Sequence, residues 1–455
     1  MKKADFLKTL NYLRRNGFRK TLTAVNERLK SHYGEDYQYM LPSESELASQ
    51  RETCVLTKDP RKISILVPAY ETAAAYLREL LDSVLSQSYP FWELLLADAS
   101  ESDIVKTTLE EWKKEHVLPD GASIRYERLP ENGGISENSN LALSYTDGDY
   151  VALLDHDDVL TPDALYSMAE QIRAYEGQDK KVAFLYSDED KWDVDTGRYT
   201  EPNLKPDYDP DYLLSNNYIC HLLVMEGSLI RRLKFRREFD GSQDYDLILR
   251  AGREAAKEGS LMIHVPKVLY HWRIHSGSTA ANPASKSYAY LAGKRALEDH
   301  LKELKIKATV MENDHVGFYQ VRYDDGIFPT REDIGAYGGK LLNRDKITIS
   351  GILDEKGICA YAGLPDSYGG EGNRATVSRR AKVLDARVMI LREELIPLYE
   401  KHMGIPYPGD YETRTRAFCR SLDDRIWKQR SIKLCEAIQK MGYVLLYTPE
   451  IHVNQ

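Results

Sequence analysis

The order of apolar and amphipathic segments between residues 63 and 154 constrains the fold more than any other feature of the sequence. Four runs rich in aliphatic and β-branched residues alternate with segments of helical periodicity; the runs are 63–67, 92–97, 124–129 and 151–154, and the helical segments are 73–87, 104–115 and 137–145. Strands and helices that alternate in this way are typical of a parallel sheet with helices on both faces. The sequence therefore predicts an α/β fold. No G-x-G-x-x-G follows the first run, which argues against a dinucleotide cofactor.

Three carboxylates follow the fourth of these runs. The apolar segment 151–154 leads directly into Asp155-His156-Asp157-Asp158. Side chains at the carboxyl ends of parallel strands line the crevice in which open α/β sheets bind ligands. Carboxylates this close repel one another, and a hard cation such as Mg²⁺ or Mn²⁺ that also bridges substrate phosphates relieves that repulsion. The alternative is an acidic turn that caps the next helix, which Thr161-Pro162-Asp163 opens.

Polar loops follow the other three runs. The first run ends in Pro68-Ala69-Tyr70-Glu71, the second in Asp98, and the third leads into Asn132-Gly133-Gly134 ahead of the helix that contains Asn140. An aromatic ring followed by carboxylates suits a nucleoside base and its ribose, and glycines let the backbone approach a ligand ahead of a helix N-terminus. Each loop taken alone is compatible with an ordinary turn. Together with the Asp155–Asp158 cluster they indicate a nucleotide site.

The motifs after these strands occur in the order found in one enzyme family. The chain carries, in sequence, Val67-Pro68-Ala69-Tyr70, Asp98, Asn132 to Asn140 and Asp155-x-Asp157. It thereby resembles the inverting nucleotide-sugar glycosyltransferases of family 2, which have the GT-A fold, a single Rossmann-like, mostly parallel sheet flanked by helices. Later motifs resemble the branch associated with O-antigen and rhamnose-rich polysaccharide assembly; they lie at 186–191, 205–207, 240–247 and 270–275. We therefore expect a catalytic domain over residues 61–282.

The resemblance implies a donor site and a metal site. It implies that the nucleotide sugar, UDP- or dTDP-linked, is bound by Pro68, Tyr70, Glu71, Asp98, Asn132, Gly134, Asn140, Asp155 and Arg273. It implies that Asp157 and Asp155 hold Mg²⁺ or Mn²⁺, with His275 as a further ligand and His271 as the second choice. Charge develops on the β-phosphate as the sugar leaves, and a bound cation stabilises it.

Asp244 is the candidate general base. It follows the loop 239–243 and begins a predicted helix, so its carboxylate would face the acceptor, and an inverting transfer needs one such base. A helix dipole lowers the pKa of a carboxyl at this position, so desolvation would have to offset it. The alternative is a plain helix cap. Relatives often carry an acidic residue where Gln243 stands, and the acceptor-side candidates are Asp188, Lys205, Trp272 and His271.

The last third of the chain contains segments that resemble the acceptor-side half of the predicted catalytic domain. After a helix and strand connector at 283–335, the segment 385–392 resembles 219–228, and Asp423-Asp424 with the following 442–449 resembles 243–244 with 261–266. We expect residues 336–455 to be a degenerate, non-catalytic half of the same fold, used for acceptor binding or self-association. The alternative is an unrelated α/β extension.

The first 60 residues form a separate predicted segment. Residues 1–30 carry nine Lys or Arg and two carboxylates, and their apolar residues recur at helical spacing with a break near Gly17. Such a basic amphipathic helix either lies on an anionic membrane surface or packs on the body or on another protomer. Because the first 30 residues contribute +7 to the net charge of −9, the remainder carries −16, which argues against nucleic acid as a partner. The sequence has no signal peptide or membrane-spanning run, so we expect a cytoplasmic protein, attached at most peripherally to the inner face of the plasma membrane.

Three functions remain to be compared. The first is a metal-dependent transferase that adds a sugar to a growing cell-surface polysaccharide or to a polyprenyl-linked glycan. The second, a nucleotidyltransferase that makes sugar nucleotides, would carry a glycine- and basic-rich loop where the chain has 68–71. The third is a glycan-binding scaffold without activity, in which the carboxylates gathered without a cation would only destabilise the fold.

Overall fold

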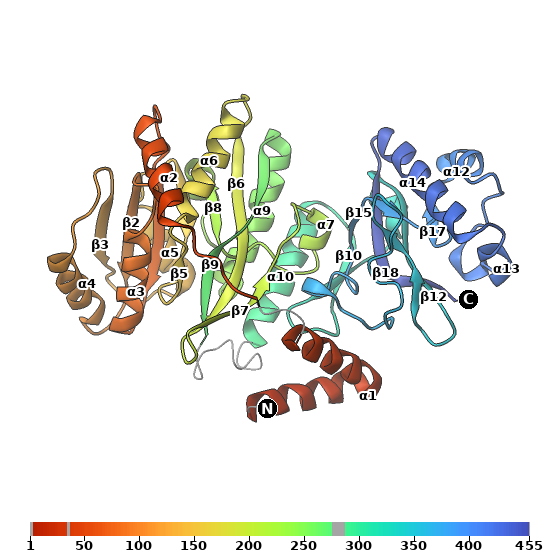
Figure 1. Cartoon of the computed structure of the whole chain (residues 1–455), viewed down its shortest axis with the longest axis horizontal. Helices are drawn as coiled ribbons and strands as arrows, with labels where there is room; N and C mark the ends of the chain where they lie inside the picture. Colours follow the sequence, from red (N-terminus) through yellow and green to blue (C-terminus); the bar gives the residue numbers. More distant parts are fainter. Residues whose placement is uncertain (1–2, 34–36, 275–286, 455) are drawn as a thin grey trace. The chain divides into compact units, whose positions relative to one another are not determined.

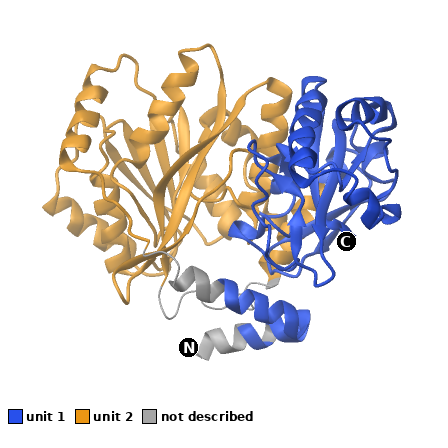
Figure 2. Ribbon diagram, turned by 45° about the vertical axis from the view of Figure 1, so that its right-hand side comes forward, with its two compact units in different colours: residues 1–35, 209–216, 301–455 blue, residues 36–208, 217–300 orange. Residues whose placement is uncertain are grey.

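The computed structural model describes residues 3–33, 37–274 and 287–454 of the chain. These form two compact units (Figure 2): unit 1 comprises residues 1–35, 209–216 and 301–455, and unit 2 comprises residues 36–208 and 217–300. The segment 209–216 thus belongs with the C-terminal region, although it lies inside the predicted catalytic segment 61–282. The sequence could not indicate that 209–216 belongs to unit 1, because this assignment depends on contacts between residues far apart in the chain.

Unit 2 is built on one sheet of nine strands, in the order β3-β2-β1-β4-β8-β6-β9-β5, with β7 paired to β6 (Figure 1). Its first half is parallel and consists of β1 (Ile63–Ala69), β2 (Trp92–Asp98), β3 (Ser123–Arg128) and β4 (Tyr150–Leu153). The predicted α/β class with a largely parallel sheet is therefore confirmed. Because β1 pairs parallel with both β2 and β4, the carboxyl ends of these three strands lie at the same edge of the sheet, and so do the loops that follow them.

The second half of the sheet is mixed. Strand β8 (Leu223–Glu226) runs antiparallel between β4 and β6 (Val182–Asp193), and β9 (Leu261–Ile274) runs parallel to β6. Strands β5 (Val159–Leu160) and β7 (Arg198–Asn203) pair antiparallel with β9 and β6. This half places β6, which carries Asp188, beside β9, which carries His271 and Trp272.

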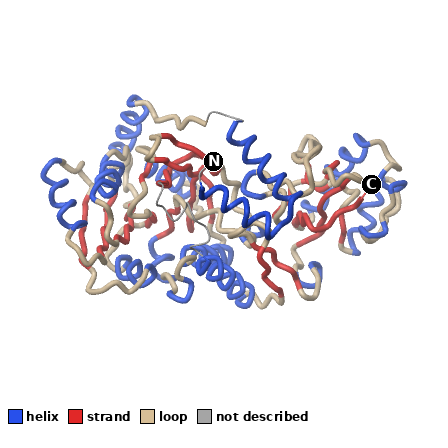
Figure 3. The backbone as a smooth tube through the Cα atoms, turned by 90° about the horizontal axis from the view of Figure 1, so that it is seen from below, coloured by secondary structure: helices blue, strands red, loops and turns tan. Residues whose placement is uncertain are grey.

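Helices flank the strands of unit 2 (Figure 3). They are α2 (Glu44–Leu56), α3 (Ala74–Leu85), α4 (Ile104–Glu115), α5 (Ile135–Leu143), α6 (Ala164–Glu176), α8 (Gly227–Leu233), α9 (Gln243–Glu258) and α10 (Ser287–Glu303). Helix α3 buries Leu77, Leu80, Leu81 and Val84 at helical spacing against the sheet. Helix α2 lies in the second half of the predicted N-terminal segment 1–60, and a capping box of Ser43 and Glu46 begins it.

Unit 1 contains a five-stranded sheet in the order β13-β12-β18-β15, with β17 paired to β12. Its elements are α7 (Pro210–Leu213), β10 (Ala308–Glu312), β11 (Tyr319–Tyr323), α11 (Ile327–Thr330), β12 (Ile334–Leu342), β13 (Thr348–Ser350), β14 (Ile352–Leu353), β15 (Arg379–Ala381), β16 (Val383–Leu384), β17 (Met389–Leu391), α12 (Ile396–Met403), α13 (Arg416–Cys419), α14 (Asp424–Lys440) and β18 (Val444–Asn454). The predicted hairpin between 308 and 323 is the antiparallel pair β10 and β11.

The pairing of these strands repeats that of unit 2. Strand β12 pairs antiparallel with β17 and parallel with β18, just as β6 pairs antiparallel with β8 and parallel with β9. A short hairpin partner follows in each case, β13 on β12 and β7 on β6. Helix α14 precedes β18 as α9 precedes β9. The two arrangements therefore share strand order, strand direction and helix position.

Helix α1 (Lys3–Tyr33) is broken at Gly17, which has a φ of +77°, and the predicted break is confirmed. The helix contacts other parts of unit 1: Arg15 Nη2 lies 2.9 Å from Glu312 Oε2, Lys20 pairs with Asp314, and the N–H of Gly369 donates to Glu27 Oε1 at 2.7 Å. Packing on the body thus occupies part of its basic face. Among the helices that the structure describes, none is long and apolar enough to cross a membrane.

Candidate active site

The carboxylates after β4 have different environments. The Asp155 side chain is 61% exposed, and Asp157 is half-buried. Asp158 is buried and accepts hydrogen bonds from the Tyr270 hydroxyl at 2.5 Å and the Arg273 N–H at 2.7 Å. Burial, with the charges of Asp155 and Asp157 nearby, raises the pKa of Asp158. Asp158 therefore ties the loop to β9 and leaves Asp155 and Asp157 as the carboxylates available to a cation.

Arg273 holds the same loop through a hydrogen bond to its backbone. Its Nη1 donates to Glu79 at 2.5 Å, its Nε donates to the carbonyl of Asp157, and the residue is 2% exposed. Its guanidinium carbon lies 4.4 Å from the ring centroids of both Tyr76 and Trp192. These groups enclose the guanidinium, although its buried Nη2 makes no hydrogen bond within the described residues. Arg273 thus positions Asp157, and the donor contact that the resemblance implies for it stays a prediction.

Asp244 lies in the first turn of α9, where its Oδ2 accepts a hydrogen bond from Asn217 Nδ2 at 2.7 Å. Burial raises the pKa of Asp244; the charge of His221 opposes the rise and that of Asp155 adds to it. Desolvation therefore does offset the helix dipole, as the sequence argument required. The mutual influence of Asp244, Asp155 and His221 also means that these three side chains lie within electrostatic reach of one another.

The loops after β1 and β2 are linked by side chains. Glu71 Oε1 accepts from the N–H groups of Glu101 and Ser102 at 2.7 and 2.9 Å, and hydrogen bonds from Ser102 lower the pKa of Glu71. Asp98 is fully buried and accepts from the N–H of Ser100, the Tyr126 hydroxyl and Arg128 Nη1, at 2.9, 2.7 and 2.9 Å. Glu71 and Asp98 thus fix this edge. Beside the half-buried Pro68, Tyr70 presents a ring that is 44% exposed.

Hydrogen bonds also fix the glycine-containing loop before α5. Asn132 Oδ1 accepts from the N–H of Gly134 at 3.2 Å, and Gly134 has a φ of +93°. A β-carbon on Gly134 would lie 3.0 Å from Asp240 Oδ2, so glycine suits both the backbone conformation and this close approach. Asn140 exchanges two hydrogen bonds of 2.8 Å with the backbone of Phe235. These contacts fix the loop, and the donor contacts that the resemblance implies for Asn132, Gly134 and Asn140 stay a prediction.

The geometry can now be compared with known proteins. Residues 64–237 match the family model described as glycosyl transferase family 2. The chain carries a glycosyltransferase family 2 domain. It is 41% identical over 241 residues to an uncharacterized protein of Sinorhizobium fredii and 34% identical over 278 residues to the O-antigen biosynthesis protein RfbC of Myxococcus xanthus. These matches cover 52% and 61% of this chain, but only 25% and 20% of the two relatives.

Among solved structures, residues 1–349 of Staphylococcus aureus TarS in complex with UDP-GlcNAc match with a TM-score of 0.39 and 18% identity. The match covers 53% of this chain and 66% of the TarS chain.

Three of the four acceptor-side candidates in the glycosyltransferase domain are buried. Asp188 Oδ1 accepts from the Lys205 N–H and from His264 Nε2, both at 2.8 Å. The Lys205 side chain is fully buried, and His271 lies with its Nδ1 2.5 Å from Asp190 Oδ1. This differs from the expectation of direct acceptor contacts, because these groups already pair with one another beneath the surface. Trp272 is half-buried, with its ring centroid 5.8 Å from that of His221.

Two residues of the glycosyltransferase domain were missed by the sequence reasoning. His221 Nδ1 lies 3.1 Å from Glu189 Oε2, and its Nε2 lies 3.8 Å from Asp155 Oδ2. The His221 ring also stacks on Tyr270 with centroids 4.7 Å apart. His221 thus bridges buried Glu189 and exposed Asp155. The sequence shows 186–191 as one motif and does not single out Glu189 within it. The only sequence signal for its partner is the histidine just ahead of β8, His221.

Charge balance explains how Glu189 stays ionised. Burial disfavours its carboxylate, but Lys205, with Nζ 3.3 Å away, and His221 outweigh this effect and lower the pKa of Glu189 to about 2. Ligand atoms of Glu189, Cys220 and His221 lie within 4.8 Å of one another, the spacing of a metal site. Because Lys205 already neutralises Glu189, this cluster does not need a cation. His275, the remaining candidate metal ligand, lies outside the described residues.

Proposed function

We propose that this chain is a metal-dependent, inverting glycosyltransferase that moves a sugar from a nucleoside diphosphate to a hydroxyl of a growing cell-surface polysaccharide or lipid-linked glycan. The observation that carries the proposal is the pair of carboxylates that follows β4, exposed Asp155 and half-buried Asp157, together with Asp244, a half-buried carboxyl whose pKa desolvation raises. The similarity to an O-antigen biosynthesis protein supports polysaccharide assembly as the setting.

The carboxylates after β4 fit a hard divalent cation, Mg²⁺ or Mn²⁺. Hydrogen bonds from Tyr270 and Arg273 engage Asp158, whereas Asp155 is exposed and Asp157 is half-buried, so these two can supply the oxygen ligands. When bound, the cation would stabilise the charge that develops on the leaving diphosphate. Arg273 holds the backbone of Asp157, and His221, whose pKa is raised because Cys220 and Glu189 outweigh the effect of burial, adds positive charge beside Asp155.

Asp244 would act on the acceptor. Its carboxylate takes the proton of the acceptor hydroxyl while that oxygen forms a bond to the anomeric carbon, on the face opposite the breaking bond to the diphosphate. Asn217 orients the carboxylate through Oδ2. Because the base must be deprotonated and burial raises its pKa, transfer should increase with pH through a range above that of an exposed aspartate.

Replacing Asp157 by alanine tests the metal site. We expect Asp157→Ala to lose the Mn²⁺-dependent part of UDP and dTDP binding, because one of two available carboxylates is removed. Isothermal titration calorimetry with and without Mn²⁺ measures this directly. Asp195→Ala, in the exposed turn between β6 and β7, is the matched control and should bind as the wild type does. Equal Mn²⁺-dependent affinity in Asp157→Ala and the wild type would contradict the ligand role.

Residues 336–455 would be a degenerate half of the same fold without catalytic activity. Asp424 lies in the first turn of α14, as Asp244 lies in the first turn of α9, and each helix precedes the last strand of its unit's sheet. In contrast to Asp244, it pairs with Arg387 at 2.7 Å and Lys428 at 2.9 Å, and its pKa is lowered because these cations outweigh partial burial. A carboxylate held in this way is a poor proton acceptor. Self-association through this region stays a prediction.

The N-terminal helix would attach the protein peripherally to the inner face of the membrane. Phe18 and Leu22, one turn apart in the part of α1 after the break, are 75% and 50% exposed, and the exposed Arg19 follows Phe18 directly. An apolar pair with a neighbouring cation suits an anionic lipid surface. We expect Phe18→Ser combined with Leu22→Ser to reduce sedimentation with phosphatidylglycerol vesicles relative to Val55→Ser, an exposed site on α2. Equal sedimentation would leave α1 with a packing role only.

A further inference from the structure

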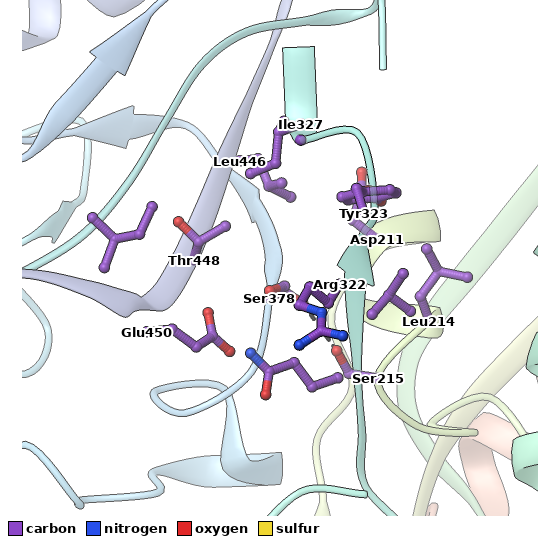
Figure 4. A pocket seen from close by; sticks show the side chains of 14 residues that line it. Asp211, Leu214, Ser215, Arg322, Tyr323, Ile327, Ser378, Leu446, Thr448 and Glu450 are labelled. Carbon is purple, nitrogen blue, oxygen red and sulfur yellow. Dashed lines mark hydrogen bonds between the residues drawn. The ribbon is translucent and has the colours of Figure 1, made fainter. Parts of the chain in front are cut away.

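An open cavity of about 190 Å³ lies within unit 1 and is lined by none of the carboxylates that we assign to transfer (Figure 4). Its walls come from four segments of the chain: α7 with the turn after it, β11 with the start of α11, Ser378 just before β15, and the middle of β18. A cavity of about 150 Å³ is enough to hold a ring the size of benzene. Nothing in the transfer mechanism uses this cavity.

A bulge in β18 builds one wall. Tyr447 pairs with Gly338 of β12 and His452 pairs with Lys340, so the four residues 448–451 lie opposite Gly339 alone. Such an insertion lifts side chains out of the regular ladder, and bulges often re-aim side chains toward a site. Thr448, Glu450 and Ile451 of this bulge all line the cavity.

Gly339 makes the bulge feasible. A β-carbon at this position would overlap the carbonyl oxygens of Thr448 and Ile451. The backbone of the bulge therefore folds back against β12 at a residue without a side chain, which fixes where its side chains point. This wall of the cavity therefore depends on two local features, the glycine at 339 in β12 and the four residues 448–451 that lie opposite it in β18.

The polar groups of the cavity are varied and nearly balanced in charge. Arg322 and Glu450 bring one charge of each sign, and Gln320 and Ser378 add neutral donors and acceptors. Asp211 also lines the cavity, but Arg331 at 2.6 Å and Arg380 at 2.9 Å compensate its charge. A cavity without excess positive charge is unsuited to a diphosphate or another polyanion.

One hydroxyl in the wall has no partner. Thr448 is 6% exposed, and its Oγ1 makes no hydrogen bond within the part of the chain that the structure describes. A buried hydroxyl without a partner costs free energy, so its presence beside a cavity calls for an explanation. Apolar surface from Leu214, Ile327 and the Tyr323 side chain completes the lining.

We propose that this cavity is a second carbohydrate site, which binds a saccharide of the neutral, hydroxyl-rich class. Planar side chains such as Arg322, Glu450 and Gln320 can bond neighbouring hydroxyls, while apolar side chains cover the C–H face of a sugar ring. The identity of the saccharide as part of the acceptor glycan rests on the proposed transferase function. The presence of the site does not.

The test is saturation-transfer NMR on the full chain with four probe disaccharides: mannobiose, rhamnobiose, chitobiose and cellobiose. We expect at least one of them to receive saturation from the wild type, and Arg322→Ala or Thr448→Val to weaken its binding about 2- to 10-fold, the loss expected for one hydrogen bond. Thr448→Val keeps the shape and removes the unpaired hydroxyl, so on stability alone it should be neutral or stabilising. Arg344→Ala, at an exposed position outside the cavity, should bind as the wild type does.

The outcomes separate this proposal from the transferase proposal. Saccharide signals that persist in Asp157→Ala, in which donor binding is lost, support a site independent of the donor. A wild type that binds a probe but no nucleotide would refute the transferase proposal and leave this one intact. The cavity proposal is overturned if no probe receives saturation, if UDP or inorganic phosphate abolishes the signal, or if the signal is equal in Arg322→Ala, Thr448→Val and the wild type.

Discussion

Asp244→Asn is expected to bind nucleotide sugar as the wild type does and to transfer sugar at least about 100-fold more slowly. Asparagine has nearly the same shape and can keep a hydrogen bond to Asn217, which now bonds Oδ2 at 2.7 Å. It cannot take a proton from the acceptor hydroxyl. Initial rates of UDP or dTDP release in the presence of acceptor measure the loss, and calorimetry measures donor binding.

The control for this variant lies in the other unit. Asp424→Asn changes the same residue type in the first turn of the corresponding helix, where Arg387 and Lys428 already pair with the carboxylate. We expect it to keep transfer near the wild-type rate. Wild-type turnover in Asp244→Asn would refute the assignment of the base, and a comparable loss in Asp424→Asn would refute the description of residues 336–455 as non-catalytic.

Lys205→Met should lower the free energy of unfolding by about 3–5 kcal/mol at neutral pH, because it leaves the buried carboxylate of Glu189 without its nearest cation. The side chains of Lys205 and Glu189 are 0% and 9% exposed, and Nζ lies 3.3 Å from Oε2. Lys181→Met is the matched control. That lysine is 52% exposed and 3.0 Å from Glu258, and an exposed pair contributes less than about 1 kcal/mol.

The pH dependence gives this prediction a second readout. The pKa of Glu189 is about 2 in the folded protein and about 4.3 in an unfolded chain. The stability that its ionised form contributes is therefore fully present above the unfolded pKa and is lost as pH falls toward the folded one. The difference between wild type and Lys205→Met, measured by urea unfolding, should shrink as the pH falls from about 4.3 toward 2. A constant difference would contradict an electrostatic origin.

The parallel half of the sheet could be predicted because it depends on local patterns. Periodicity alone located β1, β2, β3 and β4, and the polar residues at their ends followed from strand direction. The loop with Asp155 and Asp157 was recognisable for the same reason. The break at Gly17 and the hairpin of β10 and β11 were equally local features.

The environment of individual side chains could not be predicted, because it depends on distant partners. Arg273 has the position of a phosphate ligand in the sequence, yet Glu79, 194 residues away, takes its guanidinium. Asp190 lies in an acidic stretch of the sequence, yet it is buried against His271 and the Tyr37 hydroxyl. The pairing of Glu189 with Lys205 and His221 arises only when β6 and β8 meet, since neither motif indicates the other.

The shared strand order of the two units has a consequence for how such chains can change over generations. In unit 2 selection would act on side-chain chemistry, because the roles that we propose for Asp155, Asp157 and Asp244 need their carboxylates. In unit 1 it would act on backbone space, because a β-carbon at Gly339 would overlap the carbonyl oxygens of Thr448 and Ile451. Asp424 is then free to vary while Gly339 is not, so one inherited architecture would be preserved for two unrelated reasons.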